Sequence, residues 1–336
     1  MAQVDIHRYG AEDVADVRAA VEVHNAAAAE DAPWSHRTLE DRFAAKLRLG
    51  WDGEPPTAYL LCADGLPVAV AELDLPQRDN THLAWVSVAV RPDQRGRGYG
   101  STLFDGMVEE ARRAGRTSVG TEGWDCPRVL SFAARFGLEP RSRGLYRRQH
   151  VRQLDRARLG ALYDKAAAVA PDYEVLRIPG RTPPELTAPV AGLAAAINDA
   201  PTDGLDVEDE VFSPERLGAY EDALLSRGDR LYRLLARHRA SGALAGHTVV
   251  AVEGGRPGIA WQHDTAVARP HRGHRLGLLL KAGMLLWLAG AEPQVQTVDT
   301  HNAESNDHMA AVNEALGYRV MARAVELQGP LQVPAR

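Results

Sequence analysis

Apolar positions recur with two periods along the chain, and the order of these periods predicts an α/β fold. Residues 4–10 alternate as a strand does, and residues 11–30 then repeat apolar positions at helical spacing. A second helix is expected at 35–50. Three β-rich runs, bounded by turn residues, follow at 57–65, 66–76 and 82–90.

A glycine-containing segment separates the last of these runs from a helix. Residues 91–100 read RPDQRGRGYG, and the helix is expected to continue to Arg113. A short strand near 117–122 and a helix at 127–137 complete the first half.

The second half repeats this order of elements. We expect a strand at 173–180, helices at 185–199 and 213–228, and strands at 231–242, 243–254 and 258–268. A second glycine-containing loop then leads into a long apolar helix. A strand at 295–301 and a helix at 305–317 complete the repeat.

The two glycine loops align without a gap. Arg95 corresponds to Arg272 and Gly100 to Gly277, each 177 residues later (272 − 95 and 277 − 100). A repeat of this length indicates two copies of one domain, because solenoid units span only about 20–50 residues. We therefore expect an N-terminal domain at 1–152, a helical connector at 153–172 and a C-terminal domain at 173–336.

Composition narrows the functional classes. The 336 residues suit two domains, and 45% hydrophobic with 25% charged residues is typical of a globular protein. A net charge of −6 argues against a general nucleic-acid binder. Cys62 and Cys126 build neither a disulfide framework nor a zinc site. The sequence shows no membrane-length apolar run and no signal core, so we expect a cytoplasmic protein without a membrane partner.

The glycine loops suggest an anion site. Glycines let backbone N–H groups approach a ligand closely, and the helix that follows adds its free N–H groups and the positive end of its dipole. Arg95 and Arg97 add charge. A Walker A loop would need a lysine before Ser101, and a dinucleotide fingerprint would follow a first βαβ strand. A turn that binds no ligand is the alternative.

Four segments resemble the GCN5-related N-acetyltransferase superfamily. VAVRPDQRGRGYGSTL and SFAARFGLEP are similar to its acyl-CoA loop and late helix, and TAVARPHRGHRLGLLLK with THNAESNDHMAAVNEALGYR repeats both blocks. The resemblance implies two tandem domains of the α+β type. Each would be a mixed, mostly antiparallel sheet, splayed into a V and flanked by helices. It also implies acetyl-CoA as co-substrate. We expect no metal, because His263 and Asp264 are adjacent in a strand and point to opposite faces.

The resemblance assigns the cofactor contacts residue by residue. The pantetheine would bond to the strand before each loop, at Val88, Ala89, Val90, Thr265, Ala266 and Val267. The diphosphate would lie on Arg95, Gly96, Arg97, Gly98, Tyr99, Gly100 and Ser101, and on Arg272, Gly273, His274, Arg275, Leu276, Gly277 and Leu278.

The second copy departs from the first at Arg275, which stands where the first has Gly98. If that position needs a positive φ, the substitution costs on the order of 1 kcal/mol. Asn302 and Asn306 are expected to hold the pantetheine amides, with helix capping as the alternative.

Acyl transfer to an amine needs a general base. Glu72 and His82 lie on the strands near the first loop, and His263 and Asp264 near the second. Burial would raise the pKa of Glu72 and make it a useful base, and a histidine titrates in the useful range. Surface or structural roles are the alternatives. Weaker candidates are His247, Glu253 and His301.

A tyrosine that many relatives place four residues before the Gly-Phe position is replaced by Ala133 and Asn313, so the usual acid is absent from both copies. The expected function is transfer of an acetyl group from acetyl-CoA to a primary amine of a small molecule. A catalytically silent acyl-CoA-binding protein and a peptide or protein N-acetyltransferase are the alternatives. A homodimer is compatible with the sequence.

Overall fold

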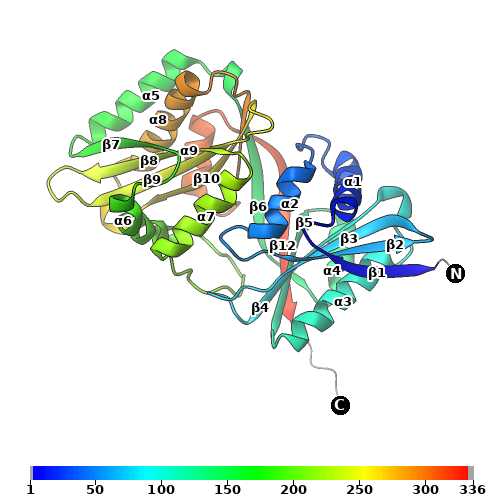
Figure 1. Ribbon diagram of the computed structural model, residues 1–336. Coiled ribbons are helices and arrows are strands. Elements are labelled where there is room, and N and C mark those ends of the chain that lie inside the picture. Colours follow the sequence, from blue (N-terminus) through cyan, green and yellow to red (C-terminus); the bar gives the residue numbers. More distant parts are fainter. Residues whose placement is uncertain (1–2, 332–336) are drawn as a thin grey trace. The chain divides into compact units, whose positions relative to one another are not determined.

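Two compact units make up the computed structural model, which describes residues 3–331 (Figure 1). Among these residues, unit 1 comprises 3–143, 202–209 and 322–331, and unit 2 comprises 144–201 and 210–321. Each unit is a mixed, mostly antiparallel sheet with helices on both faces, which confirms the predicted fold class.

The sheet of unit 1 contains six strands in the order β1-β2-β3-β4-β5-β12. Only β4 and β5 run parallel. The strands are β1 (Val4–Tyr9), β2 (Thr57–Ala63), β3 (Leu66–Asp74), β4 (Leu83–Val90), β5 (Ser118–Trp124) and β12 (Arg319–Pro330).

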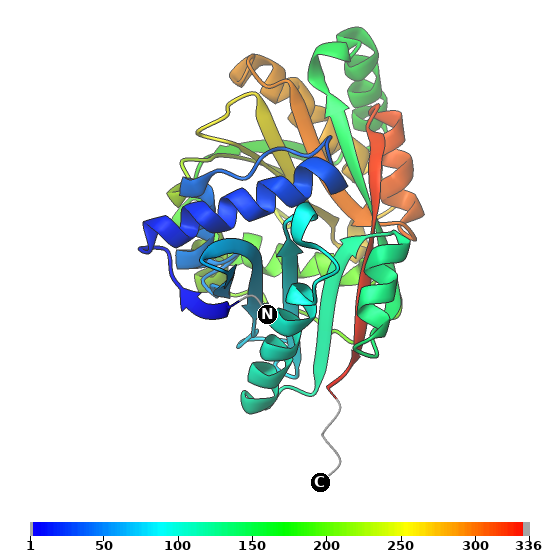
Figure 2. The same ribbon diagram turned by 90° about the vertical axis from the view of Figure 1, so that its right-hand side faces the viewer.

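Helices cover both faces of this sheet. On one face lie α1 (Val14–Asp31) and α2 (Glu40–Leu49), whose Val17, Val21 and Phe43 pack with Leu60 and Val70. On the other lie α3 (Tyr99–Arg113) and α4 (Pro127–Ala134), which enclose a second apolar cluster that includes Leu103, Phe104 and Val119. Figure 2 shows α1 and the C-terminal strand β12 from a second direction.

Unit 2 repeats this arrangement in the order β7-β8-β9-β10-β11-β6, with β10 and β11 parallel. Its strands are β6 (Glu139–His150), β7 (Tyr173–Pro179), β8 (Arg230–His238), β9 (Leu244–Val252), β10 (Ile259–Val267) and β11 (Thr297–Ala303). The helices α6 (Pro184–Ala194) and α7 (Pro214–Ser226) cover one face, and α5 (Arg156–Val169), α8 (Leu276–Ala291) and α9 (Asp307–Ala315) cover the other.

The last strand of each sheet comes from the opposite half of the sequence. β6 pairs with β11, and β12 pairs with β5. The compact units therefore cross the boundaries expected at 152 and 173, which follow the sequence repeat. The expected connector at 153–172 becomes α5, which packs on α8 inside unit 2.

Sequence patterning missed β6 and β12. In β6 the consecutive residues Arg147, Arg148 and Gln149 are all buried, so no alternation of apolar and polar residues marks the strand. Arg148 is accommodated because it makes a bidentate ion pair with the buried Asp299 on β11, with both N···O distances at 2.7 Å.

The two central parallel strands of each unit separate after three residue pairs. β4 pairs with β5 only from Leu83 to Trp85, and β10 pairs with β11 only from Ile259 to Trp261. Beyond these points each pair of strands diverges into the predicted V. The edge of β4 on the side of β5 therefore has backbone groups that no strand pairing occupies. The same holds for the edge of β10 on the side of β11.

Unit 2 contains one extra residue at this place. The β3–β4 register is continuous, whereas the β9–β10 register shifts between Gln262 and Thr265. The spacing between copies accordingly rises from 176 at Trp85 and Trp261 (261 − 85) to 177 beyond the shift. The inserted residue is a β-bulge, a distortion that reorients side chains and often lies next to functional sites.

The split in unit 1 depends on close packing of Trp85 against Gly120. A Cβ on Gly120 would lie 2.2 Å from the Trp85 ring. We expect Gly120→Ala to destabilise the protein by about 1–3 kcal/mol. Gly106→Ala on the exposed face of α3, where a Cβ meets nothing within 4 Å, is the matched control and should be neutral or stabilising. Chemical denaturation followed by tryptophan fluorescence measures both, and equal stabilities would contradict the packing argument.

Candidate functional site

The two glycine loops have the same backbone conformation. In unit 1, a short 3-10 helix (Pro92–Gln94) precedes Gly96 at φ 77° and Gly98 at φ 89°, and Gly98 is the N-cap of α3. In unit 2, Gly273 has φ 85° and Arg275 has φ 55° as the N-cap of α8. The expected strain at Arg275 is therefore present, at about 1 kcal/mol.

Both loops leave space for an anion in front of a helix N-terminus. A Cβ added to Gly96, Gly98 or Gly273 would meet no atom within 4 Å. Gly100 differs, because a Cβ there would lie 3.2 Å from Val90 and press the helix away from the strand. The loops thus present backbone N–H groups without side chains in front of them, and this arrangement fits a diphosphate.

Two of the predicted arginine contacts already have protein partners. Arg95 donates to the carbonyl of Val90 at 3.2 Å and makes a bidentate contact with Asp31 at 3.0 and 2.7 Å. Arg272 donates to the carbonyl of Val267 at 3.1 Å and pairs with Asp199 at 2.6 Å. Each arginine ties its loop to the end of the strand and to an earlier helical segment.

Arg97 and Arg275, by contrast, are exposed. Among the predicted arginine contacts, these two are therefore better disposed to meet phosphate oxygens. The other predicted loop residues, Tyr99, Ser101, His274, Leu276, Gly277 and Leu278, lie in the loops or in the first turns of α3 and α8.

The expected pantetheine strand segments lie beyond the split. Val88, Ala89 and Val90 end β4, and Thr265, Ala266 and Val267 end β10. Beyond the split these segments pair only with β3 and β9, respectively. Their second edges are thus oriented to bond a ligand that enters the V.

The two asparagines differ in what they do. Asn306 caps α9, because its Oδ1 accepts from the Met309 N–H at 3.1 Å. Asn302 accepts from Arg147 at 2.8 Å and from Asn313 at 3.2 Å. For Asn306 the capping alternative describes the structure, and Asn302 belongs to a buried polar cluster.

Glu72 is ionised, contrary to the expectation of a raised pKa. Its carboxylate lies on β3 on the face covered by α1 and α2, in contact with Lys46 and 3.5 Å from His24 Nε2. Burial alone would raise the pKa of Glu72, but Lys46 and His24 outweigh it and lower the pKa to about 2. A carboxylate with so low a pKa is a weak base.

Asp74, two residues further along β3, has the raised pKa that was expected of Glu72. It points to the same side of the sheet and lies opposite Trp85, where the V begins. Burial, opposed by Lys46 and assisted by Glu72, raises the pKa of Asp74 to about 6. This carboxylate is ionised at neutral pH and still basic enough to accept a proton.

His82 is not brought together with Glu72. It precedes β4 at the end farthest from the glycine loop, and its imidazole contacts the carboxylate of Asp206 at 3.3 Å. Its backbone carbonyl accepts from Thr117 and Ser118. These contacts give His82 a structural role at the start of the strand.

In unit 2 the bulge carries both predicted residues. His263 packs edge-on against Tyr220 of α7, with ring centroids 5.9 Å apart. Burial raises the pKa of Asp264 despite the attraction of Arg233, and burial with the charge of Asp264 raises the pKa of Tyr220. A carboxyl and a phenol thus lie near each other on the α6–α7 face.

Behind them lies a buried ionic group. Arg233 contacts Glu221 at 3.0 Å and His247 Nδ1 at 3.3 Å, and Glu221 accepts from Thr182. Burial and Arg233 lower the pKa of His247 to about 3, so this histidine is neutral and does not act as a base near pH 7.

Sequence reasoning missed four residues that the structure places in these clusters: His24, Lys46, Asp74 and Tyr220. A signal existed for two of them. Asp74 shares the strand parity of Glu72, and Lys46 is one of only three lysines in the chain, beside Lys165 and Lys281. His24 and Tyr220 lie on helices whose sequence contains nothing that marks them.

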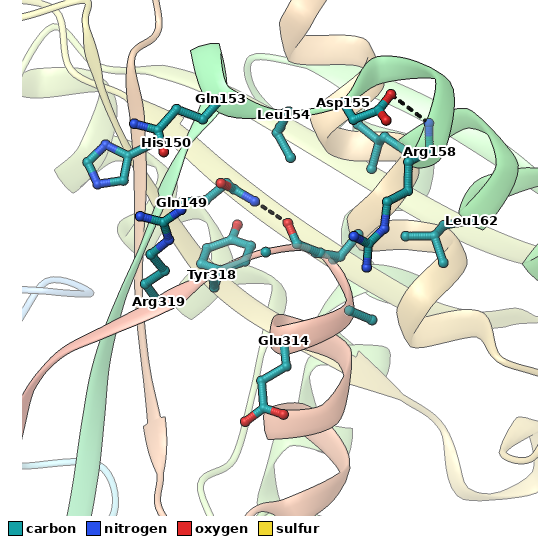
Figure 3. Close-up of a pocket in the computed structure, with 14 residues that line it drawn as sticks. Gln149, His150, Gln153, Leu154, Asp155, Arg158, Leu162, Glu314, Tyr318 and Arg319 are labelled. Atoms are coloured by element: carbon teal, nitrogen blue, oxygen red, sulfur yellow. Dashed lines mark hydrogen bonds between the residues drawn. The ribbon is translucent and has the colours of Figure 1, made fainter.

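A pocket of about 430 Å³ lies elsewhere in unit 2 (Figure 3). It is lined by β6, the start of α5 and the turn after α9, including Gln149, Arg158 and Tyr318. None of the predicted site residues lines it.

Within residues 3–331, no helix is both long enough and apolar enough to span a membrane. In the same part of the chain, His, Cys, Asp and Glu side chains form no group of three that could hold a metal ion.

Comparisons with known proteins agree with this geometry. Residues 20–138 match the model of the Acetyltransferase (GNAT) family. A solved tandem GNAT protein from the clavulanic acid biosynthesis pathway is 29% identical, with a TM-score of 0.82 over 99% of this chain and 100% of its own. No curated protein matches the sequence significantly.

Two more distant structures share the fold. A GCN5-related N-acetyltransferase from Sphaerobacter thermophilus is 18% identical, with a TM-score of 0.66 over 99% of this chain and 97% of its own. A glucosamine N-acetyltransferase region of a fungal multi-domain enzyme is 14% identical, with a TM-score of 0.66 over 98% of this chain and 38% of its own. Residues 20–138 therefore match the Acetyltransferase (GNAT) family, and the chain as a whole has the fold of a solved tandem GNAT protein, with two copies of that fold.

Proposed function

We propose that this protein transfers the acetyl group of acetyl-CoA to a primary amine of a small molecule, and that unit 1 carries the reaction. The family transfers acetyl groups from acetyl-CoA to an acceptor. The observation that carries the assignment to unit 1 is Asp74, a half-buried carboxylate of near-neutral pKa at the point where the V begins.

The residues of unit 1 suit the separate requirements of the reaction. The loop at 95–101 would hold the diphosphate of the coenzyme, and the free edge of β4 would hold its pantetheine. The bound thioester supplies the acyl electrophile. N–H groups at the free edge of β4 would stabilise the oxyanion. A thiol has a pKa of roughly 8.5, so it leaves without an acid, and the absence of a tyrosine at Ala133 is tolerable.

The acceptor amine must lose a proton, and Asp74 is the group that takes it. An acceptor between the α1–α2 face and β3 would meet Asp74 and the Glu72–Lys46 ion pair together. Lys46 keeps Glu72 anionic, and the Glu72 carboxylate helps to raise the pKa of Asp74. A small amine fits this setting because Glu72 is buried and Asp74 is half-buried on β3, beside Lys46 of α2.

Unit 2 is a second candidate for catalysis. The bulge in β10 brings Asp264, whose raised pKa makes it a better base, near Tyr220, whose raised pKa keeps the phenol protonated. Its loop, however, has a strained arginine at the position of Gly98, a cost in stability that the loop of unit 1 does not carry.

Binding of the diphosphate at the loop 95–101 can be tested with a substitution that adds a negative charge. Gly98→Asp places a carboxylate against the diphosphate and should remove one equivalent of acetyl-CoA from the binding stoichiometry measured by calorimetry. Gly115→Asp is the matched control, since Gly115 also has a positive φ of 78° and open surroundings but follows the far end of α3. Stoichiometry unchanged by Gly98→Asp would show that the diphosphate lies elsewhere.

The base can be tested by pH. We expect kcat/KM to fall below pH 6 in the wild type, because Asp74 must be ionised to accept a proton. Asp74→Asn should lower kcat/KM by about 10²–10⁴-fold, remove that acid limb and leave acetyl-CoA binding intact. Asp105→Asn on the exposed face of α3 is the control. Full activity in Asp74→Asn together with its loss in Asp264→Asn would move the reaction to unit 2.

A further inference from the structure

The side chain of Lys281 in unit 2 is buried without a counter-ion. It lies on α8, is 2% exposed, and is among the largest fully buried side chains of the chain. Its Nζ lies 5.0 Å from the centre of the Tyr318 ring. Among residues 3–331 it makes neither a hydrogen bond nor an ion pair. A buried ammonium without a carboxylate partner is costly, and proteins seldom retain one without a use.

Polar atoms around Lys281 also lack partners. Arg147, 3% exposed, donates to Asn302, but its Nε has no hydrogen-bond partner. Asn313, 0% exposed, donates to the same asparagine, and its Oδ1 has none. The buried hydroxyl of Tyr318 is also unsatisfied. Several such atoms in one place indicate that a bound group completes the cluster.

The charge of the cluster is positive. The buried carboxylate of Asp299 is already held by both bonds from Arg148. Glu304 and Glu314 attract Arg147 from further out, and Glu314 is exposed and extends away from Tyr318 (Figure 3). Lys281 and Arg147 therefore share no buried acid of their own. Burial and the charge of Arg147 lower the pKa of Lys281 to about 7.

The fold does not require this polarity, because unit 1 is apolar at the same positions. Lys281 corresponds to Phe104 (281 − 177), which packs on Phe132 and Phe136 at 5.6 and 4.3 Å. With Gly137 aligned to Gly317, Asn313 corresponds to Ala133 and Tyr318 to Leu138, each 180 residues earlier (313 − 133 and 318 − 138). Ala133 and Leu138 are buried in the apolar core of unit 1.

We propose that Lys281, Arg147, Asn313 and Tyr318 form a carboxylate-binding subsite in unit 2. A carboxylate accepts hydrogen bonds at both oxygens, so it would satisfy the free Arg147 Nε and the Tyr318 hydroxyl while neutralising Lys281. Tyr318 also lines the pocket of about 430 Å³, so one member of the cluster borders an opening of unit 2 (Figure 3).

The carboxylate that binds this subsite has two possible sources. The carboxylate belongs either to a free acid, such as a dicarboxylate or an amino acid, or to the end of a dicarboxylic acyl group on coenzyme A. The second source rests on the proposed function, because it requires that unit 2 binds an acyl-CoA. The first does not.

Calorimetry in low-chloride buffer separates these cases with three probes: succinate, succinyl-CoA and acetyl-CoA. We expect succinate or succinyl-CoA to bind the wild type, and Lys281→Met to weaken that binding at least about 30-fold, the usual consequence of removing one partner of a buried charge pair. Lys165→Met, at an exposed lysine of α5, should change nothing. The Lys281→Met variant leaves no acid unpaired, so its melting temperature without ligand should not fall below that of the wild type.

Tyr318→Phe provides a second test that leaves the packing intact. It removes only the unsatisfied hydroxyl and should weaken succinate or succinyl-CoA binding by about 10–100-fold, as loss of one hydrogen bond to a charged group does. Binding of succinate shows the free-acid source, and binding of succinyl-CoA but not succinate shows the acyl source. Failure of acetyl-CoA alone to bind refutes the proposed function and leaves the subsite standing. Absence of binding by both succinate and succinyl-CoA, or equal affinities in wild type, Lys281→Met and Tyr318→Phe, overturns the subsite.

Discussion

The limited pairing of the central parallel strands governs both units. β4 and β5 share three residue pairs, as do β10 and β11, and then diverge. A sheet without this split would use every backbone group of its inner strands and would have no edge for a ligand. In unit 1 the Trp85 ring lies against Gly120 where the split begins. The glycine loop and the first turn of the next helix follow directly from the freed strand, so the open loop and the open strand edge lie next to each other.

The two copies have diverged in what they bury around that common frame. Unit 1 keeps an apolar core beneath α3 and α4 and concentrates its charge on the α1–α2 face at Glu72, Lys46 and Asp74. Unit 2 carries charge on both faces, with Arg233 and Glu221 on one and Lys281 and Arg147 on the other. A buried polar group needs partners that a repeat does not supply automatically, so the charges that unit 2 buries belong to that copy and not to the common fold.

Local pattern was sufficient for much of this architecture and insufficient for specific parts. The strands and helices that bury one apolar face, such as β3 and α3, follow from periodicity, and the equivalence of the loops follows from their spacing. Periodicity did not predict β6, because its buried side chains include two arginines and a glutamine. The partner of Arg148 lies about 150 residues away in the sequence. The exchange of β6 and β12 between units has no local signal at all, since it depends on which strand edge is free when the chain arrives.

Neighbouring charges explain why burial alone gave the wrong direction for the pKa of Glu72, and why the pKa of Lys281 falls. Burial favours the neutral form of any acid or amine, but a neighbouring opposite charge reverses that effect. Glu72 has Lys46 of α2 and His24 of α1 beside it, so it stays ionised. The sequence of β3 alone does not reveal these neighbours. Lys281 has Arg147 beside it instead, and its pKa falls. A buried charge that finds its partner within the fold is structural. A buried charge that has only a like charge beside it either loses its charge or binds an oppositely charged ligand. In unit 2 the unsatisfied atoms around Lys281 favour a bound ligand.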